Sequence, residues 1–185
     1  AAHRAYLAAA KRGHRASQIE LAEFYLNGWT GVQSFDKALY WYEMAAQQNS
    51  PYAQYMLAKV LLDRKRDEGS ARNALEWLKR AATQGHPAAS HLLGRFYEQG
   101  EIRDQNRMQA FHLYQRAAAQ GFIAAKTSLA RCYRLGIGTK VSPTKAVAWY
   151  KQAAHSDSAD PQALFELAWC YQSGFGINRD PIMAE

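Results

Sequence analysis

One leucine recurs along the chain at a nearly constant interval, and this repetition constrains the fold more than any other feature. The interval is 36 residues for three steps and 38 for the last, through Leu21, Leu57, Leu93, Leu129 and Leu167. A small residue follows each leucine, and an alanine recurs at the 36-residue interval in the other half of each unit, at Ala38, Ala74, Ala110 and Ala146. Such self-similarity is typical of repeat proteins, in which each unit packs only against its neighbours.

The apolar residues within each half-unit are spaced by three, four and seven positions, which is the period of an α-helix. Each repeat is therefore predicted to be two antiparallel helices, here called helix A and helix B. We expect helix A at 16–27, 51–63, 87–99, 123–135 and 161–173, and helix B at 2–12, 35–48, 70–84, 105–120 and 143–155. Because one helix pair cannot bury both of its faces, the sequence predicts an all-α solenoid of stacked pairs.

The residues at the expected helix ends support these boundaries. A residue that tolerates the left-handed conformation follows four of the B helices, at Gly13, Asn49, Gly85 and Gly121. Proline opens three of the A helices, at Pro51, Pro87 and Pro161, where its missing N–H costs nothing. Glycine ends every helix A except the second, where Arg64 predicts a less regular turn.

These boundaries divide the chain into one repeat domain. Residues 1–14 are helix B of a preceding repeat, full repeats occupy 15–50, 51–86, 87–122 and 123–160, and 161–185 begins a further repeat. We therefore expect the sequence to be a piece of a longer array.

Composition restricts the possible partners and chemistry. The formal net charge of +7 permits an acidic partner, although it is equally consistent with solubility alone. No run of 18 apolar residues is present, so no membrane span is expected. The cysteines, Cys132 and Cys170, hold the same position in neighbouring A helices and are predicted to be unpaired core thiols.

No pattern in the sequence indicates catalysis. None of the six histidines forms a pair with one-turn spacing on a helix, so no metal site is predicted. The Gly-x-Gly segments at 136–138 and 174–176 lack the preceding strand of a nucleotide-binding fingerprint and read as interhelical turns. We expect no cofactor and no enzymatic activity.

Several segments resemble the Sel-1-like repeat, a relative of the tetratricopeptide repeat. The resemblance is carried by Lys145-Ala146 with Trp149–Ala154, by the Gly-x-Gly turns, and by the segment 165–177 (FELAWCYQSGFGI). It implies a right-handed superhelix that acts as a scaffold or adaptor for other proteins, and it favours a bacterial periplasmic or secreted location. The chain lacks the paired cysteines that clamp each helix pair in cysteine-rich bacterial members.

The resemblance also directs attention to the A helices, which by analogy with tetratricopeptide arrays line the inner curve. Positions that vary between repeats on that face are not dictated by packing, and from them we predict a partner-binding set: Tyr55, Lys59, His91, Arg95, Arg131 and Arg134. A protein partner with an acidic segment would suit this set.

The charges of this set leave two readings open. Lys59 is expected to be partly neutralised by Asp63, and Arg95 by Glu98. Arg131 and Arg134 have no acidic residue one helical turn away. They are either free for a partner, in which case replacing both should cost little stability, or not available as a site, because Arg134 reaches Glu98 of the adjacent repeat or because both are simply solvated.

Two further alternatives concern other partners and the exposed aromatics. A polyanion such as an acidic polysaccharide or nucleic acid is the second candidate ligand, but the aromatic residues expected on this face, Tyr55 and Phe165, are too few for a stacking surface. Trp29, in an A–B loop, either folds over its own helix pair or offers an exposed contact.

Overall fold

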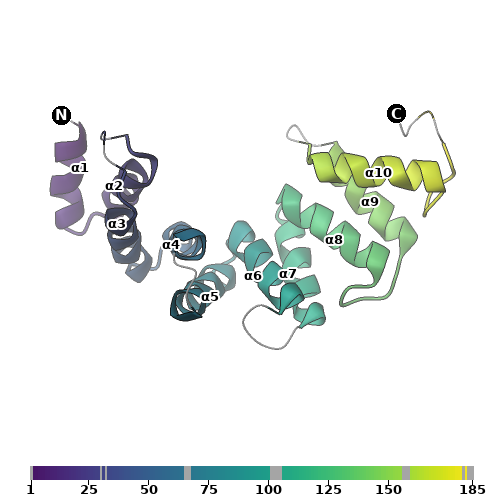
Figure 1. The fold of residues 1–185 in the computed structure, drawn as a ribbon, viewed down its shortest axis with the longest axis horizontal. Helices are drawn as coiled ribbons and strands as arrows, with labels where there is room; N and C mark the ends of the chain where they lie inside the picture. Colours follow the sequence, from purple (N-terminus) through teal and green to yellow (C-terminus); the bar gives the residue numbers. More distant parts are fainter. Residues whose placement is uncertain are drawn as a thin grey trace. The chain divides into compact units, whose positions relative to one another are not determined.

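A computed structural model describes residues 2–29, 31, 33–64, 68–100, 106–155, 159–180 and 182. These residues form ten α-helices and no strand (Figure 1). The chain divides into two compact units, Ala1–Ala89 and Ser90–Glu185, and each unit is considered by itself. The N-terminal unit contains α1 to α5, and the C-terminal unit contains almost all of α6 and the whole of α7 to α10.

The prediction of alternating A and B helices is confirmed, and each observed end lies within two residues of the predicted one. The A helices are α2 (Arg15–Asn27), α4 (Pro51–Arg64), α6 (Pro87–Gln99), α8 (Ile123–Leu135) and α10 (Pro161–Ser173). The B helices are α1 (Ala2–Lys11), α3 (Phe35–Gln47), α5 (Glu68–Thr83), α7 (Arg107–Ala119) and α9 (Pro143–Ala154).

The helix ends follow the chemistry of the residues placed there. The four residues predicted to be left-handed after the B helices all have positive φ, including Asn49 at 65°, the one described non-glycine residue in that region. Asp160 begins α10 by accepting a hydrogen bond from the backbone N–H of Gln162. The turn after Arg64, most of the loop before Asp160 and nearly all of the expected helix B after 180 lie outside the described residues.

Small residues let the helices of each repeat approach closely. In the C-terminal unit, the alanine pair Ala117-Ala118 and the tyrosines Tyr114 and Tyr150 are buried in one apolar cluster. Gly94 lies so near the Tyr114 ring that an added Cβ would come within 2.7 Å of it. The absence of a side chain at Gly94 therefore admits the Tyr114 ring of the following helix B.

The Gly-x-Gly turns also allow close contact between neighbouring repeats. Gly138 has a φ of 67°, and an added Cβ would overlap the backbone carbonyl of Arg107 at the start of α7. Gly176 approaches Pro143, at the start of α9, in the same way. The second glycine of each motif thus lets the A–B turn of one repeat rest on the first residue of helix B in the preceding repeat.

The cysteines and Trp29 can now be placed. Cys132 and Cys170 are buried and unpaired, as predicted, and burial raises the pKa of Cys132 to about 12. The Trp29 side chain is 63% exposed, yet its ring meets the Phe24 ring edge-on at 5.6 Å. Trp29 therefore contacts its own helix pair while remaining largely open to solvent.

Candidate partner-binding pocket

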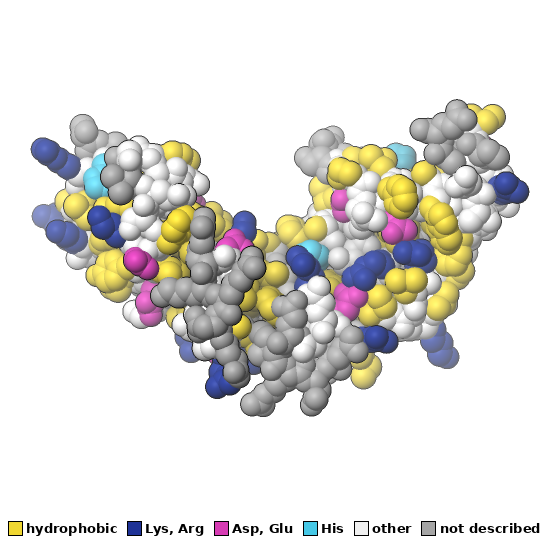
Figure 2. All heavy atoms as spheres, viewed as in Figure 1, with side chains coloured by type: hydrophobic (Ala, Val, Ile, Leu, Met, Phe, Trp, Pro, Cys, Tyr) yellow, Lys and Arg dark blue, Asp and Glu magenta, His cyan; other side chains and the backbone are white. Residues whose placement is uncertain are grey.

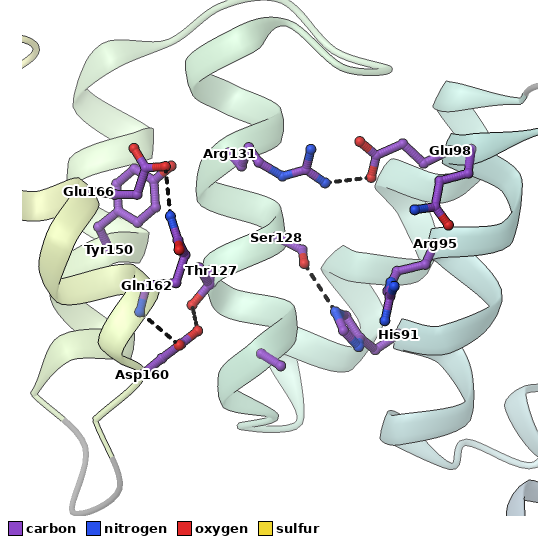
Figure 3. A pocket seen from close by; sticks show the side chains of 12 residues that line it. His91, Arg95, Glu98, Thr127, Ser128, Arg131, Tyr150, Asp160, Gln162 and Glu166 are labelled. Carbon is purple, nitrogen blue, oxygen red and sulfur yellow. Dashed lines mark hydrogen bonds and ion pairs between the residues drawn. The ribbon is translucent and has the colours of Figure 1, made fainter. Parts of the chain in front are cut away.

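The A helices of the C-terminal unit enclose a pocket of about 650 Å³ (Figure 3). We call it the α8 pocket, because α8 lies between the walls formed by α6 and α10. Its lining residues are His91, Arg95, Glu98, Gln99, Ala124, Thr127, Ser128, Arg131, Tyr150, Asp160, Gln162 and Glu166. On the face of this unit that Figure 2 shows, basic and acidic side chains lie close together.

One side of the pocket is built by bonds between α6 and α8. The Arg131 guanidinium lies 2.6 Å from the Glu98 carboxylate, and the same carboxylate oxygen accepts a hydrogen bond of 2.8 Å from the Tyr114 hydroxyl. Nearby, the His91 Nε2 atom and the Ser128 hydroxyl are 3.0 Å apart. The Arg131–Glu98 and His91–Ser128 contacts join one repeat to the next and hold α6 against α8, whereas the Tyr114–Glu98 bond lies within one repeat.

The other side is built by bonds between α8 and α10. The Thr127 hydroxyl donates to the carboxylate of Asp160 at 2.5 Å, and the other Asp160 oxygen caps α10. The Glu166 carboxylate accepts bonds from Arg134 at 3.3 Å and from Gln162 at 3.1 Å. The acidic groups of this wall are therefore already satisfied by donors of the chain itself.

His91 and Tyr150 each keep one charge state near neutral pH. Burial, together with the neighbouring Arg95 and Arg131, lowers the pKa of His91 to about 4, against the opposing effect of Glu98 and Asp160. Burial also raises the pKa of Tyr150 to about 12. His91 is consequently neutral and Tyr150 carries its proton at pH 7.

Arg95 is the exception among the charged residues that line the pocket. It is exposed, and within the described part of the chain it has no ion pair. The expectation that Glu98 neutralises it is wrong, because Glu98 bonds to Arg131 and Tyr114 instead. The bonds of Glu98 leave the Arg95 guanidinium available at the pocket edge.

The expectation that Arg131 and Arg134 lack acidic partners is also wrong. Arg131, rather than Arg134, reaches Glu98, and Arg134 pairs with Glu166. Arg134 does not line the pocket, because its guanidinium lies over the Trp169 ring, 5.4 Å from the centroid. Both arginines therefore join neighbouring repeats.

The remaining two predicted site residues, Tyr55 and Lys59, lie on α4 in the N-terminal unit. Tyr55 is half-buried rather than exposed, and its ring stacks on His86 at 4.9 Å. Lys59 is exposed, and among the described residues it has no ion pair with Asp63 or any other acid. The α8 pocket contains neither of them.

Sequence reasoning missed most of the pocket's polar partners, notably Ser128, Tyr150, Asp160 and Glu166. A sequence signal exists for part of this network, because Arg131 lies 33 positions after Glu98, and Thr127 lies 33 before Asp160. Comparing each A helix with the next at this offset would have found these two pairs, but neither Ser128, 37 positions after His91, nor Glu166, 32 positions after Arg134. The same offset places Leu62 before Arg95 and Leu26 before Lys59, so neither cation has an acid at the pairing position.

Other classes of site find little support in the described residues. No group of three metal-ligating side chains comes together in the described ranges. None of the helices described is long and apolar enough to cross a bilayer.

Comparisons with known proteins agree with this architecture. A model of the Sel1 repeat matches residues 15–50, 51–86, 87–122, 123–158 and 161–185. A Sel1 repeat protein from Oxalobacter formigenes is 29% identical, with a TM-score of 0.82, and the match covers 94% of this chain and 70% of that chain. A search of curated proteins gives no match.

Two further solved structures show how the fold recurs. A protective antigen of uropathogenic Escherichia coli strains that displays an SLR fold is 25% identical, with a TM-score of 0.58, over 98% of this chain and 46% of that chain. An immunity protein from Pseudomonas aeruginosa is 26% identical, with a TM-score of 0.54, over 98% of this chain and 64% of that chain.

Sel1 repeat proteins are generally scaffolds for protein interaction, and the family is a non-catalytic helical repeat. With five matched repeats along paired helices of this geometry, the chain belongs to the Sel1 repeat family.

Proposed function

We propose that the protein is an interaction scaffold that binds a segment of a partner protein in the α8 pocket, on the A-helix face of the C-terminal unit. The pocket volume, about 650 Å³, lies in the range of pockets that hold ligands. The observation that carries the proposal is that bonds between repeats hold both walls before any partner arrives. A preformed site lowers the ordering cost of binding.

The polyanion alternative draws less support from the same geometry. Of the three arginines predicted on this unit's face, Arg131 and Arg134 are each bonded to a carboxylate. Polyanion binding depends on several free cations that together displace counterions. With Arg95 alone as the binding cation, the affinity would depend little on salt concentration. The geometry therefore supports a protein partner better than a polyanion.

A steric block tests the proposal without changing charge. Ala124 lines the pocket, and the same repeat position carries Tyr52 in the N-terminal unit, so helix A accommodates a large side chain there. Ala124→Trp should abolish capture of the partner in a pull-down identified by mass spectrometry. Ala148→Trp, at an exposed alanine of α9 outside the pocket, is the matched control and should capture the partner normally.

Two outcomes would contradict the proposal. If Ala124→Trp and wild type capture the same proteins, the partner uses another surface. If capture instead decays steeply with salt and an acidic polysaccharide competes with it, the polyanion alternative replaces the scaffold.

A further inference from the structure

We propose that the α8 pocket recognises a single carboxylate of its partner, from an Asp or Glu side chain, and that the Arg95 guanidinium binds it. This inference rests on the proposed function, because it names the chemistry of what that pocket holds. It starts from the available charge: Arg95 is exposed, lines the pocket and has no ion pair among the described residues.

The acidic groups of the pocket argue against a cationic ligand. Glu98 accepts from Arg131 and Tyr114, while Glu166 accepts from Arg134 and Gln162. One carboxylate oxygen of Asp160 accepts a hydrogen bond from Thr127, and the other caps the start of α10. Because each carboxylate already accepts from donors of the chain, a lysine or arginine of a partner would gain less from binding one of them than from binding an unpaired carboxylate.

Two side chains of the pocket have donor groups that no described residue accepts. Arg95 has five N–H groups that no described residue accepts. The Tyr150 hydroxyl accepts from Arg134 at 3.4 Å, and its own hydrogen has no acceptor in the described part of the chain. A ligand that is an acceptor is therefore favoured over one that is a donor.

The number of free charges distinguishes a carboxylate from a phosphate. One guanidinium matches a carboxylate in charge and in its planar, two-bond geometry. A phosphate group carries more charge at neutral pH, and here it would face the carboxylates of Glu98, Asp160 and Glu166, with Arg95 as the one unpaired cation among the described residues of the pocket. The arrangement thus favours the monoanion.

The pocket walls distinguish a side chain from a chain terminus. Carboxyl termini are commonly held by successive free backbone N–H groups. Most residues that line the pocket lie beyond the first turn of α6, α8, α9 and α10, where backbone N–H groups are bonded within the helix, and the N–H of Gln162 in the first turn of α10 is bonded to Asp160. We therefore assign the carboxylate to an Asp or Glu side chain in a segment that continues beyond the pocket.

Solution NMR of the complete ¹⁵N-labelled chain provides a direct test through the Nε–Hε resonance of Arg95. The probes are a short peptide capped at both ends with one central Glu, its Gln counterpart, an uncapped-terminus peptide without acidic side chains, and inorganic phosphate. The capped Glu peptide should move the Arg95 resonance saturably, with at least tenfold higher affinity than any other probe. Arg95→Lys keeps the charge but loses the planar fork, and it should weaken binding of the Glu peptide about tenfold, or 1.4 kcal/mol.

Arg107→Lys, at an exposed arginine of α7 outside the pocket, is the matched control and should leave the titration unchanged. Equal affinity for the Gln peptide or for phosphate would overturn the assignment of the ligand to a carboxylate. Tighter binding of the uncapped peptide would show that the carboxylate comes from a chain terminus and not from an Asp or Glu side chain. An Arg95 resonance that never moves would reject the site. If Ala124→Trp still abolishes partner capture in that last case, the proposed function stands and this inference alone fails.

Discussion

The Arg131 guanidinium lies 2.6 Å from the carboxylate of Glu98, a residue 33 positions earlier and one repeat away. Arg134 repeats the relationship in the other direction, with Glu166 lying 32 positions later. Each pair spans the gap between adjacent A helices, so charges that look unpartnered within one helix are matched between repeats. These arginines therefore contribute to the stability of the fold, although they lie at its surface.

The Glu98–Arg131 pair should couple measurably in a double-mutant cycle. With Glu98→Gln and Arg131→Gln, we expect a coupling free energy of about 1 kcal/mol from urea unfolding followed by circular dichroism, because Glu98 is largely shielded from water. The exposed pair Glu76–Lys79 is the control and should couple by about 0.3 kcal/mol. Equal coupling in both cycles would show that the Glu98–Arg131 pair is no more than a surface contact.

Two equivalent tyrosines should respond differently to loss of their hydroxyl groups. The Tyr114 hydroxyl donates to Glu98, whereas the buried Tyr42 hydroxyl has no partner among the described residues. Tyr114→Phe should lower the free energy of unfolding by about 1 kcal/mol, and Tyr42→Phe should leave it unchanged or raise it. Urea denaturation of both variants checks this, and a loss at Tyr42 as large as that at Tyr114 would contradict it.

The cause of the unpartnered Tyr42 hydroxyl can be tested by supplying an acceptor. Leu26 holds the repeat position that Glu98 holds beside Tyr114. In the Leu26→Gln variant the new amide oxygen should accept from Tyr42, so Tyr42→Phe should then cost about 1 kcal/mol that it does not cost in wild type. Additive effects of the two substitutions in the same unfolding assay would rule out the new bond.

His91 should make the C-terminal unit sensitive to acid. Its pKa in the folded protein is about 4, below the ordinary value near 6.5, so between these values the unfolded chain binds a proton that the folded chain does not. Stability is therefore full above about pH 6.5 and falls as the pH is lowered, by roughly 1–2 kcal/mol at pH 5. His91→Gln should flatten this part of the curve of unfolding free energy against pH, and substitution of the exposed His112 provides the control.

Gly138 should tolerate a side chain less well than Gly121, although both have positive φ. An added Cβ meets nothing within 4 Å at Gly121, so Gly121→Ala should cost about 1 kcal/mol of backbone strain. At Gly138 it meets the backbone carbonyl of Arg107, which cannot move without shifting α7. Gly138→Ala should cost about 1–3 kcal/mol more by thermal or urea unfolding, and equal costs would show that the close approach is unimportant.

The helices could be predicted from sequence because their causes are local. Three local features determine the helices: the helical period of the apolar residues, a proline at the helix start and a left-handed residue after the helix end. The prolines are Pro51, Pro87 and Pro161, and the left-handed residues are Gly13, Asn49, Gly85 and Gly121. Even the unusual Asn49 follows from its place after a helix B.

The pocket was less predictable because its bonds run between repeats. Arg131 and Arg134 looked free when only residues one turn away were considered, yet their partners lie 33 and 32 positions away. Those offsets depend on how far one helix slides past the next, which a helical period does not specify. Consequently, replacing both arginines by Glu should destabilise the fold, contrary to what their apparent exposure indicated.

The bonds between A helices also determine which repeats can be neighbours. An exchange of the repeats 87–122 and 123–160 would separate Arg131 from Glu98 and Arg134 from Glu166, and would leave charges without counterparts in a partly dry interface. A junction whose pairing position holds Leu26 carries no such requirement. Side-chain pairs thus restrict which repeats can be neighbours at some junctions and not at others. Recombination or design could insert, delete or shuffle repeats at the junctions without such pairs.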